Sequence, residues 1–346
     1  MGQDGIIRTG SEPLVEVFAE WATTRGVENS SVKQYRSILG RGVEPFFGSR
    51  PIGTLSSSDV SEWVEWMTRT RSYKPSTVRF RFNILTSVFA WAVENGLDAA
   101  NPCKGVTLPS SRARTHRDQR AEVHIPSTGV VHAVIGAAPE RYRGMLWLMA
   151  GCGLRLGEAM GIGRDRVRFR DRMITVDRQV ACDGDTGSGR YGRMRLRHIK
   201  WREEGDRGRE VPLPEVVALA VRRHLKEHGT WGVEELLFSN VSGTGLLYPQ
   251  YWYTRIWKPA LAGAGVDYFK PHSFRHFYAA SLLAQGVPVT ELSAWLGHSS
   301  VSFTERYYGD LMPDAPDRAR LAMDGVLGVV RPVGVDAGPV RLHGVA

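Results

Sequence analysis

The chain has 346 residues, more than one hydrophobic core usually organises, so we expect two domains. No stretch approaches the roughly 18 uncharged apolar residues that span a bilayer, and the N-terminus lacks the apolar segment of a signal peptide. These absences argue against a membrane or secreted protein and predict a soluble, cytoplasmic one. The net charge of +9, with a pI near 9.6, favours a polyanionic partner such as nucleic acid.

The cysteines and glycine-rich stretches carry no cofactor signature. Cys103, Cys152 and Cys182 are scattered without a CxxC pair, which predicts neither a disulfide framework nor a zinc site. The sequence contains no Walker motif, metal-ligand cluster or glycine-rich nucleotide loop. We therefore expect no cofactor and no metal.

The first region, from about Glu12 to Gly96, has helical periodicity. Its apolar residues fall into three groups, namely Leu14, Val15, Phe18, Trp21 and Ala22, then Val60, Trp63, Val64 and Met67, then Val78, Phe82, Leu85, Val88, Phe89 and Ala92. Ser58 and Asp59 are the expected caps of the second group, and Ser76, after Pro75, is the expected cap of the third. The pattern predicts a compact helical domain over residues 11–108, after a short leader over residues 1–10.

Basic residues cluster in two places around this domain. Near the start of its third helix are Arg71, Lys74, Arg79 and Arg81. They fit either phosphate contacts or a solvated polar face. Residues 109–121 lack periodicity and contain further arginines, which is typical of an extended interdomain linker.

The second region, residues 122–326, mixes strands and helices and precedes a Gly- and Val-rich tail over residues 327–346. EVHIP is a short strand candidate, and helices are expected around residues 129–138 and 141–152. Further strand candidates are RVRFR, DRMITVDRQV, MRLRHIKW and REVPLP. The turn sequence EEGDRG between the last two predicts that they form a hairpin. From Pro214 onward we expect mainly helix.

Several residues with chemical potential lie in this second region. His272 and Arg275 in HSFRH are three residues apart, so both can address one anion from the same helix face, although such a pair is often only a surface feature. His298 follows Gly297, an expected helix C-cap. Three further candidates are Arg155 and Glu158, both in GLRLGE, and Lys200, which is the only lysine between Lys104 and Lys226. Each of these residues, taken alone, also fits a structural role.

Taken together, the motifs resemble those of the tyrosine recombinase family of phage integrases and chromosome-resolving recombinases. GLRLGE, HSFRH, LGHSS and RYYGDL are similar to the family's boxes and follow in the family's order. The helical region before the linker also resembles the family's core-binding domain, so the resemblance spans nearly the whole chain. It implies a mainly α-helical fold with a small β-sheet, made of a helical core-binding domain and a mixed α/β catalytic domain.

The resemblance assigns a role to each candidate. Arg155 and Arg275 match the arginines that hold the scissile phosphate. A guanidinium group suits this role because it is planar, permanently charged and able to donate two parallel hydrogen bonds to phosphate oxygens. Tyr308 matches the nucleophile, His272 is the candidate base, and Lys200 matches the general acid. His298 matches the histidine that hydrogen-bonds the phosphate, and Glu158 matches the acidic residue that supports Arg155. Asp310 stands where the family commonly has a histidine, which leaves Tyr307 open as an alternative nucleophile.

The implied activity is cleavage and rejoining of DNA at specific sites through a 3′-phosphotyrosine, which stores the energy of the broken bond and needs no ATP. The role would be integration or excision of a phage or mobile element by a homotetramer on paired sites in the nucleoid, with possible accessory DNA-bending factors and no membrane contact.

A helix around residues 316–327 would pack on a neighbouring subunit, and the few residues before the first helix predict no separate arm-binding domain. Two alternatives are a type IB topoisomerase and a DNA-binding protein without catalysis.

Overall fold

The computed structural model of the chain describes residues 10–25, 29–97, 100–109, 124–183, 193–199, 208–298 and 300–308, together with Arg320 and Met323. The chain divides into two compact units, which we describe separately. The first unit comprises Met1–Glu122, Arg178–Ile199 and Phe238–Trp252, and the second comprises Val123–Asp177, Lys200–Leu237 and Tyr253–Ala346.

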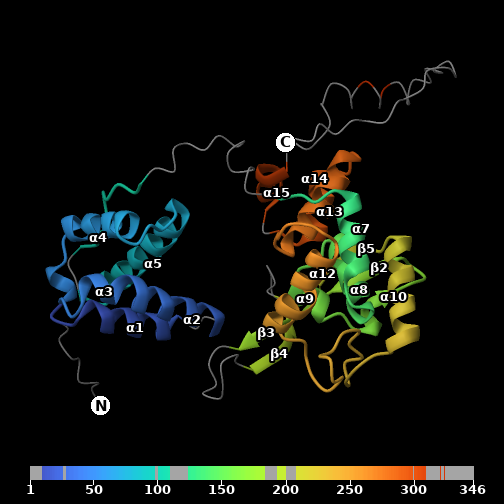
Figure 1. Cartoon of the computed structure of the whole chain (residues 1–346). Coiled ribbons are helices and arrows are strands. Elements are labelled where there is room, and N and C mark those ends of the chain that lie inside the picture. Colours follow the sequence, from blue (N-terminus) through green and yellow to red (C-terminus); the bar gives the residue numbers. More distant parts are fainter. Residues whose placement is uncertain are drawn as a thin grey trace, which may run out of the picture. The chain divides into compact units, whose positions relative to one another are not determined.

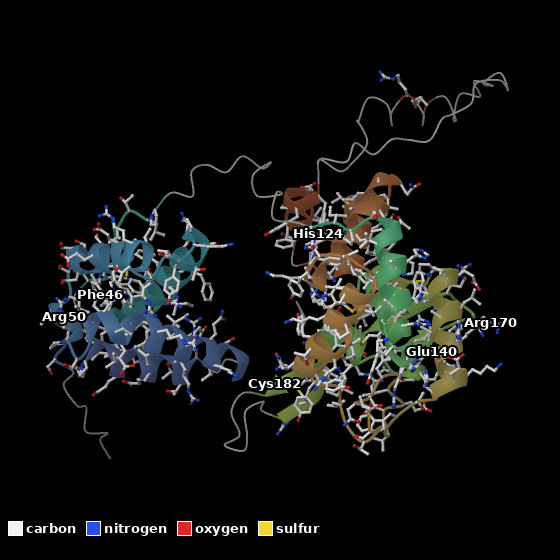
Figure 2. The ribbon with its side chains drawn as sticks, viewed as in Figure 1. Phe46, Arg50, His124, Glu140, Arg170 and Cys182 are labelled. Carbon is white, nitrogen blue, oxygen red and sulfur yellow. The ribbon has the colours of Figure 1, made fainter. Side chains whose placement is uncertain are left out.

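Helices build most of the first unit, and Figure 1 shows them in blue to blue-green. In chain order they are α1 (Leu14–Thr24), α2 (Asn29–Ile38), the π-helical turn η1 (Leu39–Val43), α3 (Glu44–Phe47), the 3-10 turn η2 (Ile52–Thr54), α4 (Ser57–Arg69) and α5 (Pro75–Glu94). Trp21, Trp63 and Phe89 are almost fully buried in their common core. Phe46, labelled in Figure 2, packs its ring against Phe47 and Trp66. The helical periodicity read from the sequence is confirmed here.

Of the predicted cap residues in this unit, Asp59 takes part in a helix cap, whereas Ser58 and Ser76 do not. Ser56 caps α4: its hydroxyl accepts from the backbone of Asp59, and the Asp59 carboxylate accepts from the Ser56 backbone N–H at 2.8 Å. This reciprocal capping box uses the first serine of the run and places Asp59 inside the helix. Helix α5 begins at Pro75, because proline at the first helical position needs no hydrogen-bond partner for its nitrogen.

The basic cluster near the start of α5 separates into exposed and buried members. Arg71, Lys74 and Arg79 are exposed, whereas Arg81 is 9% exposed. The guanidinium carbon of Arg81 lies 4.1 Å from the centre of the Tyr73 ring, in a cation–π contact. Arg81 is therefore part of the core and is not available to a phosphate.

The strands pair differently from the predicted hairpin. The strand β4 (Arg193–His198) pairs antiparallel with β3 (Arg178–Asp183) in the first unit. In the second unit, β5 (Arg209–Pro212) pairs with β2 (Met173–Val176), which also pairs with β1 (Val167–Arg168). The β2–β5 register sets Ile174 opposite Val211, and both are fully buried. Burial of these two facing residues fixes the register of the pair.

The helices of the second unit pack mainly around α8 (Glu140–Gly151) and α13 (His272–Ala284). The others are α7 (Thr128–Ala137), α9 (Leu156–Met160), η3 (Arg164–Arg166), α10 (Glu215–His228), η4 (Tyr253–Trp257), α12 (Lys258–Gly263), α14 (Val289–Leu296) and α15 (Val301–Tyr308); α11 (Pro249–Trp252) belongs to the first unit. Helix α8 contacts both α10 and α13, and α13 contacts α14 and α15 (Figure 1). The predicted fold class, mainly α with little β-structure, is confirmed.

The segment that precedes α7 is not a strand in its described part. Residues 124–126 of the strand candidate EVHIP have no regular structure. His124, labelled in Figure 2, instead stacks on Phe269 with ring centres 4.6 Å apart. None of the helices within the described ranges is long and apolar enough to cross a membrane. The predicted linker beyond residue 109, the tail, Lys200 and Asp310 lie outside the described residues, as does the predicted helix 316–327 apart from Arg320 and Met323.

Candidate active site

A sharp bend after α8 positions Arg155. Gly153 has a φ of +64°, and a Cβ there would lie 2.5 Å from the Tyr278 ring, so glycine is required for both backbone and packing reasons. Arg155 is the N-cap residue of α9, and its backbone N–H donates to Glu158 at 2.8 Å. Its guanidinium donates to the other Glu158 oxygen at 2.8 Å and to the Gly297 carbonyl at 3.3 Å. The GLRLGE motif thus fixes the direction of one arginine.

Glu158 is held by two arginines. It is 1% exposed, and besides Arg155 it accepts hydrogen bonds from Arg209 at 3.0 and 2.6 Å. Burial raises the pKa of Glu158, but the charges and hydrogen bonds of Arg209, with the charge of Arg155, outweigh it and lower the pKa to about 2. The carboxylate is therefore ionised and anchors Arg155.

Arg275 projects from α13 and is almost completely buried. It is 1% exposed, and its guanidinium donates to the Gly153 carbonyl at 2.8 Å and to the Leu296 carbonyl. Burial, followed by the positive charge of Arg155, lowers the pKa of Arg275 to about 9, which leaves it protonated at neutral pH. Two carbonyls from distant segments therefore aim this guanidinium.

The end of α14 positions His298. Gly297 terminates α14 in the left-handed conformation, with φ of +62°, as the sequence predicted. The backbone N–H of His298 donates to the Ser293 carbonyl, and its Nδ1 shares a 2.7 Å hydrogen bond with the Thr304 hydroxyl. Burial and then the charge of Arg275 lower the pKa of His298 to about 3, so the imidazole is neutral at physiological pH.

These side chains converge on one pocket. Its volume is about 400 Å³, and it is lined by Arg155, His272, Arg275, Gly297, His298 and Phe303. Desolvation by the surrounding protein, and then the charges of Arg275 and Arg155, lower the pKa of His272 to about 4. The pocket therefore combines two guanidinium cations with two neutral imidazoles, an arrangement suited to binding an anion such as a phosphodiester.

Tyr308 does not line this pocket, although it is close to Arg275. It is 2% exposed and packs among apolar residues of α13 and α14. Its hydroxyl shares a hydrogen bond with Nδ1 of His276. Burial raises the pKa of Tyr308 to about 12, although the charge of Arg275 acts in the opposite direction. The phenol is thus protonated and needs a proton acceptor before it can attack.

Tyr307, the alternative nucleophile, has a different environment. It is 38% exposed, and its ring lies 4.6 Å from the ring of Phe303, which lines the pocket. The two tyrosines therefore differ in exposure and partners, and each can be tested separately.

Two residues of the site were missed in the sequence. Arg209, the first residue of β5, pairs with Glu158 and donates to the Trp295 carbonyl at 2.6 Å. Arg209 is 51 residues from Glu158 in the sequence, so no local sequence pattern indicates that the two residues pair. A local pattern did exist for His276, because it follows His272 by four residues and the two therefore lie on one helix face. Lys200 lies outside the described residues, so its place in the site stays a prediction.

Comparison with known proteins bears on this arrangement. The profile of the phage integrase family matches residues 129–312. A tyrosine recombinase XerC-like protein of Caldanaerobacter subterraneus subsp. tengcongensis is 28% identical over 258 residues, covering 68% of this chain and 63% of the relative. A putative prophage phiRv2 integrase of Mycobacterium tuberculosis is 24% identical over 297 residues, covering 85% of this chain and 74% of the relative.

The fold is likewise similar to solved structures. A Tn1549 transposon integrase in complex with circular intermediate DNA aligns with a TM-score of 0.72 at 19% identity, covering 91% of this chain and 99% of that one. The profile match covers more than half of the chain. The chain belongs to the phage integrase family, the tyrosine recombinases, which are DNA strand-transferring enzymes.

Proposed function

We propose that this protein is a site-specific recombinase that cuts and rejoins DNA through a transient 3′-phosphotyrosine at Tyr308, and that it integrates or excises a mobile element. The observation that carries the proposal is the pocket that Arg155, His272, Arg275 and His298 line together. The integrases named among its relatives support the role in DNA mobility.

The pocket residues suit the chemistry of phosphodiester cleavage. A phosphodiester resists attack because its negative charge repels a nucleophile. Arg155 and Arg275 would neutralise the nonbridging oxygens as charge accumulates in the transition state. The neutral imidazoles of His272 and His298 add hydrogen-bond donors to the same oxygens. Glu158 and Arg209 hold Arg155 in place.

In the proposed reaction, the Tyr308 oxygen forms a bond to phosphorus as the bond from phosphorus to the DNA 5′ oxygen breaks. The phenol proton passes to a neighbouring imidazole, and we propose that Lys200 donates a proton to the departing 5′ oxygen. In rejoining, a new 5′ hydroxyl attacks the phosphotyrosine and gives its proton to Lys200, while the departing phenol takes its proton back from the imidazole.

The proposal extends to domains and assembly. We propose that residues 11–108 form a core-binding domain, that a basic linker over 109–121 connects it to a catalytic domain over 122–326, and that four copies act on paired DNA sites in the nucleoid. The net charge of +9 and the exposed Arg71, Lys74 and Arg79 at the start of α5 support contact of the helical domain with DNA.

The test is formation of a covalent adduct. A duplex selected from a random-sequence pool by binding to the protein serves as the probe, with a nick placed so that the cleaved end diffuses away. We expect a protein–DNA adduct that survives denaturation with the wild type. Binding of the selected duplex without any adduct would contradict the proposal, and relaxation of plasmids that lack the selected sequence would favour a topoisomerase.

A further inference from the structure

The hydrogen bond between His276 and Tyr308 joins a neutral imidazole to the proposed nucleophile. Nδ1 of His276 and the Tyr308 hydroxyl are the partners, and the two ring centres are 5.7 Å apart. Burial, followed by the nearby His272 and Arg275, lowers the pKa of His276 to about 4. A neutral imidazole has one ring nitrogen that accepts. With the phenol protonated, the simplest assignment has the hydroxyl donating to Nδ1 and the ring proton on Nε2.

His276 also lies next to the pocket without lining it. Its ring meets that of His272 edge to face, with centres 4.7 Å apart, and His272 lines the pocket. Arg275 directly precedes His276 on α13 and is fixed by the carbonyls of Gly153 and Leu296. One helix thus carries two groups for the phosphate and one group for the tyrosine. Of these two histidines on α13, it is His276 whose ring nitrogen meets the Tyr308 oxygen.

We propose that His276 is a further catalytic residue, the acceptor of the Tyr308 proton, and that His272 acts on the phosphate. This inference rests on the proposed function and on Tyr308 as the nucleophile. As the bond from the Tyr308 oxygen to phosphorus forms, the O–H bond breaks and its proton passes to Nδ1 of His276. In the rejoining step the same proton returns to the departing phenol, and His276 ends neutral.

The electrostatics of the pocket favour such a role once DNA is bound. In the free protein, burial is the main cause that opposes protonation of His276, and the charges of His272 and Arg275 add to it. A phosphodiester bound to Arg275 brings negative charge that offsets the effect of these charges, so the imidazole becomes a better base when the substrate is in place.

The test combines a conservative variant with a more acidic nucleophile. In His276→Asn, an amide oxygen can replace Nδ1 as a hydrogen-bond acceptor but cannot take up a proton. We expect adduct formation on the selected nicked duplex to slow about 100-fold. A fluorinated tyrosine at position 308, with a lower phenol pKa, should restore His276→Asn to within about tenfold of the wild-type rate. His132→Ala, an exposed histidine on α7, is the matched control and should cleave as the wild type does.

Each result has one meaning. A wild type that binds the duplex but forms no adduct refutes the proposed function itself. If the wild type forms the adduct and His276→Asn matches or exceeds its rate, His276 is not the proton acceptor. A slowed His276→Asn that the fluorinated tyrosine does not rescue assigns His276 a packing role and also overturns the inference.

Discussion

Arg81 in the first unit and Arg275 in the second are both at least nine-tenths buried, but their surroundings differ. The guanidinium of Arg81 packs over Tyr73, and its Nη1 has no hydrogen-bond partner among the described residues. The guanidinium of Arg275 is held by two carbonyls and lines a pocket together with a second arginine and two histidines. Burial of an arginine is therefore not a sign of function. Convergence of several groups on a space that can hold an anion is the stronger sign.

The largest effect should follow from Arg275→Lys. The two carbonyls are bonded by two different guanidinium nitrogens, and the single nitrogen of lysine cannot take both positions while it also contacts the phosphate. We expect adduct formation to fall about 10³-fold, with a smaller change in affinity for the duplex. A quenched time course of the adduct measures the rate. A rate within tenfold of the wild type would mean that Arg275 is structural, as Arg81 is.

Glu158→Gln should give the next largest effect, on stability. Removing the carboxylate leaves Arg209 and Arg155 without their ion-pair partner. We expect the free energy of unfolding of the second unit to fall by about 3 kcal/mol, as for a broken buried ion pair. Urea denaturation followed by a probe in the second unit measures it. A loss below about 1 kcal/mol would show that the pair adds little to stability.

The same variant has a defined pH dependence. The folded pKa of Glu158, about 2, lies below its ordinary value of 4.5, so its stabilisation is fully present above pH 4.5 and is lost as the pH falls towards 2. The difference in stability between wild type and Glu158→Gln should therefore shrink over this range. A difference that stays constant down to pH 2 would contradict the assigned pKa.

Arg81→Met should give the smallest effect, and only on stability. Methionine keeps much of the packing volume and loses the cation–π contact with Tyr73. We expect a loss of about 1 kcal/mol and a rate of adduct formation indistinguishable from that of the wild type. Differential scanning calorimetry and the adduct assay check the two parts. A large loss of cleavage by a folded Arg81→Met would remove the contrast with Arg275.

Local sequence patterns predicted where the helices of the first unit lie, but they did not predict which residue caps a helix or which strands pair. The spacing of Leu14, Phe18 and Trp21 was sufficient to predict α1, because apolar residues at this spacing lie on one face of a helix and that face is buried. The cap of α4 was misplaced because a run of serines offers several candidates, and only the Asp59 carboxylate selects Ser56. The predicted hairpin was wrong because strand pairing depends on burial between distant segments, here Ile174 against Val211.

The site was predictable to the extent that its residues share short motifs. Arg155, His272, Arg275 and His298 were identified from their boxes, and the structure brings them to one pocket. Arg209 was missed because its partner Glu158 lies on another element. His276 was missed although its spacing from His272 was visible, because a second histidine gains meaning only when its contact with Tyr308 is seen.

The most direct test of the central claim is to identify the tyrosine that carries the DNA. The trapped adduct is digested with nuclease and protease, and fragmentation of the peptide that contains both Tyr307 and Tyr308 locates the nucleotide by mass spectrometry. We predict a nucleotide linked through its 3′-phosphate to Tyr308, loss of the adduct in Tyr308→Phe and its retention in Tyr307→Phe. A nucleotide on Tyr307, with the adduct lost only in Tyr307→Phe, would contradict it.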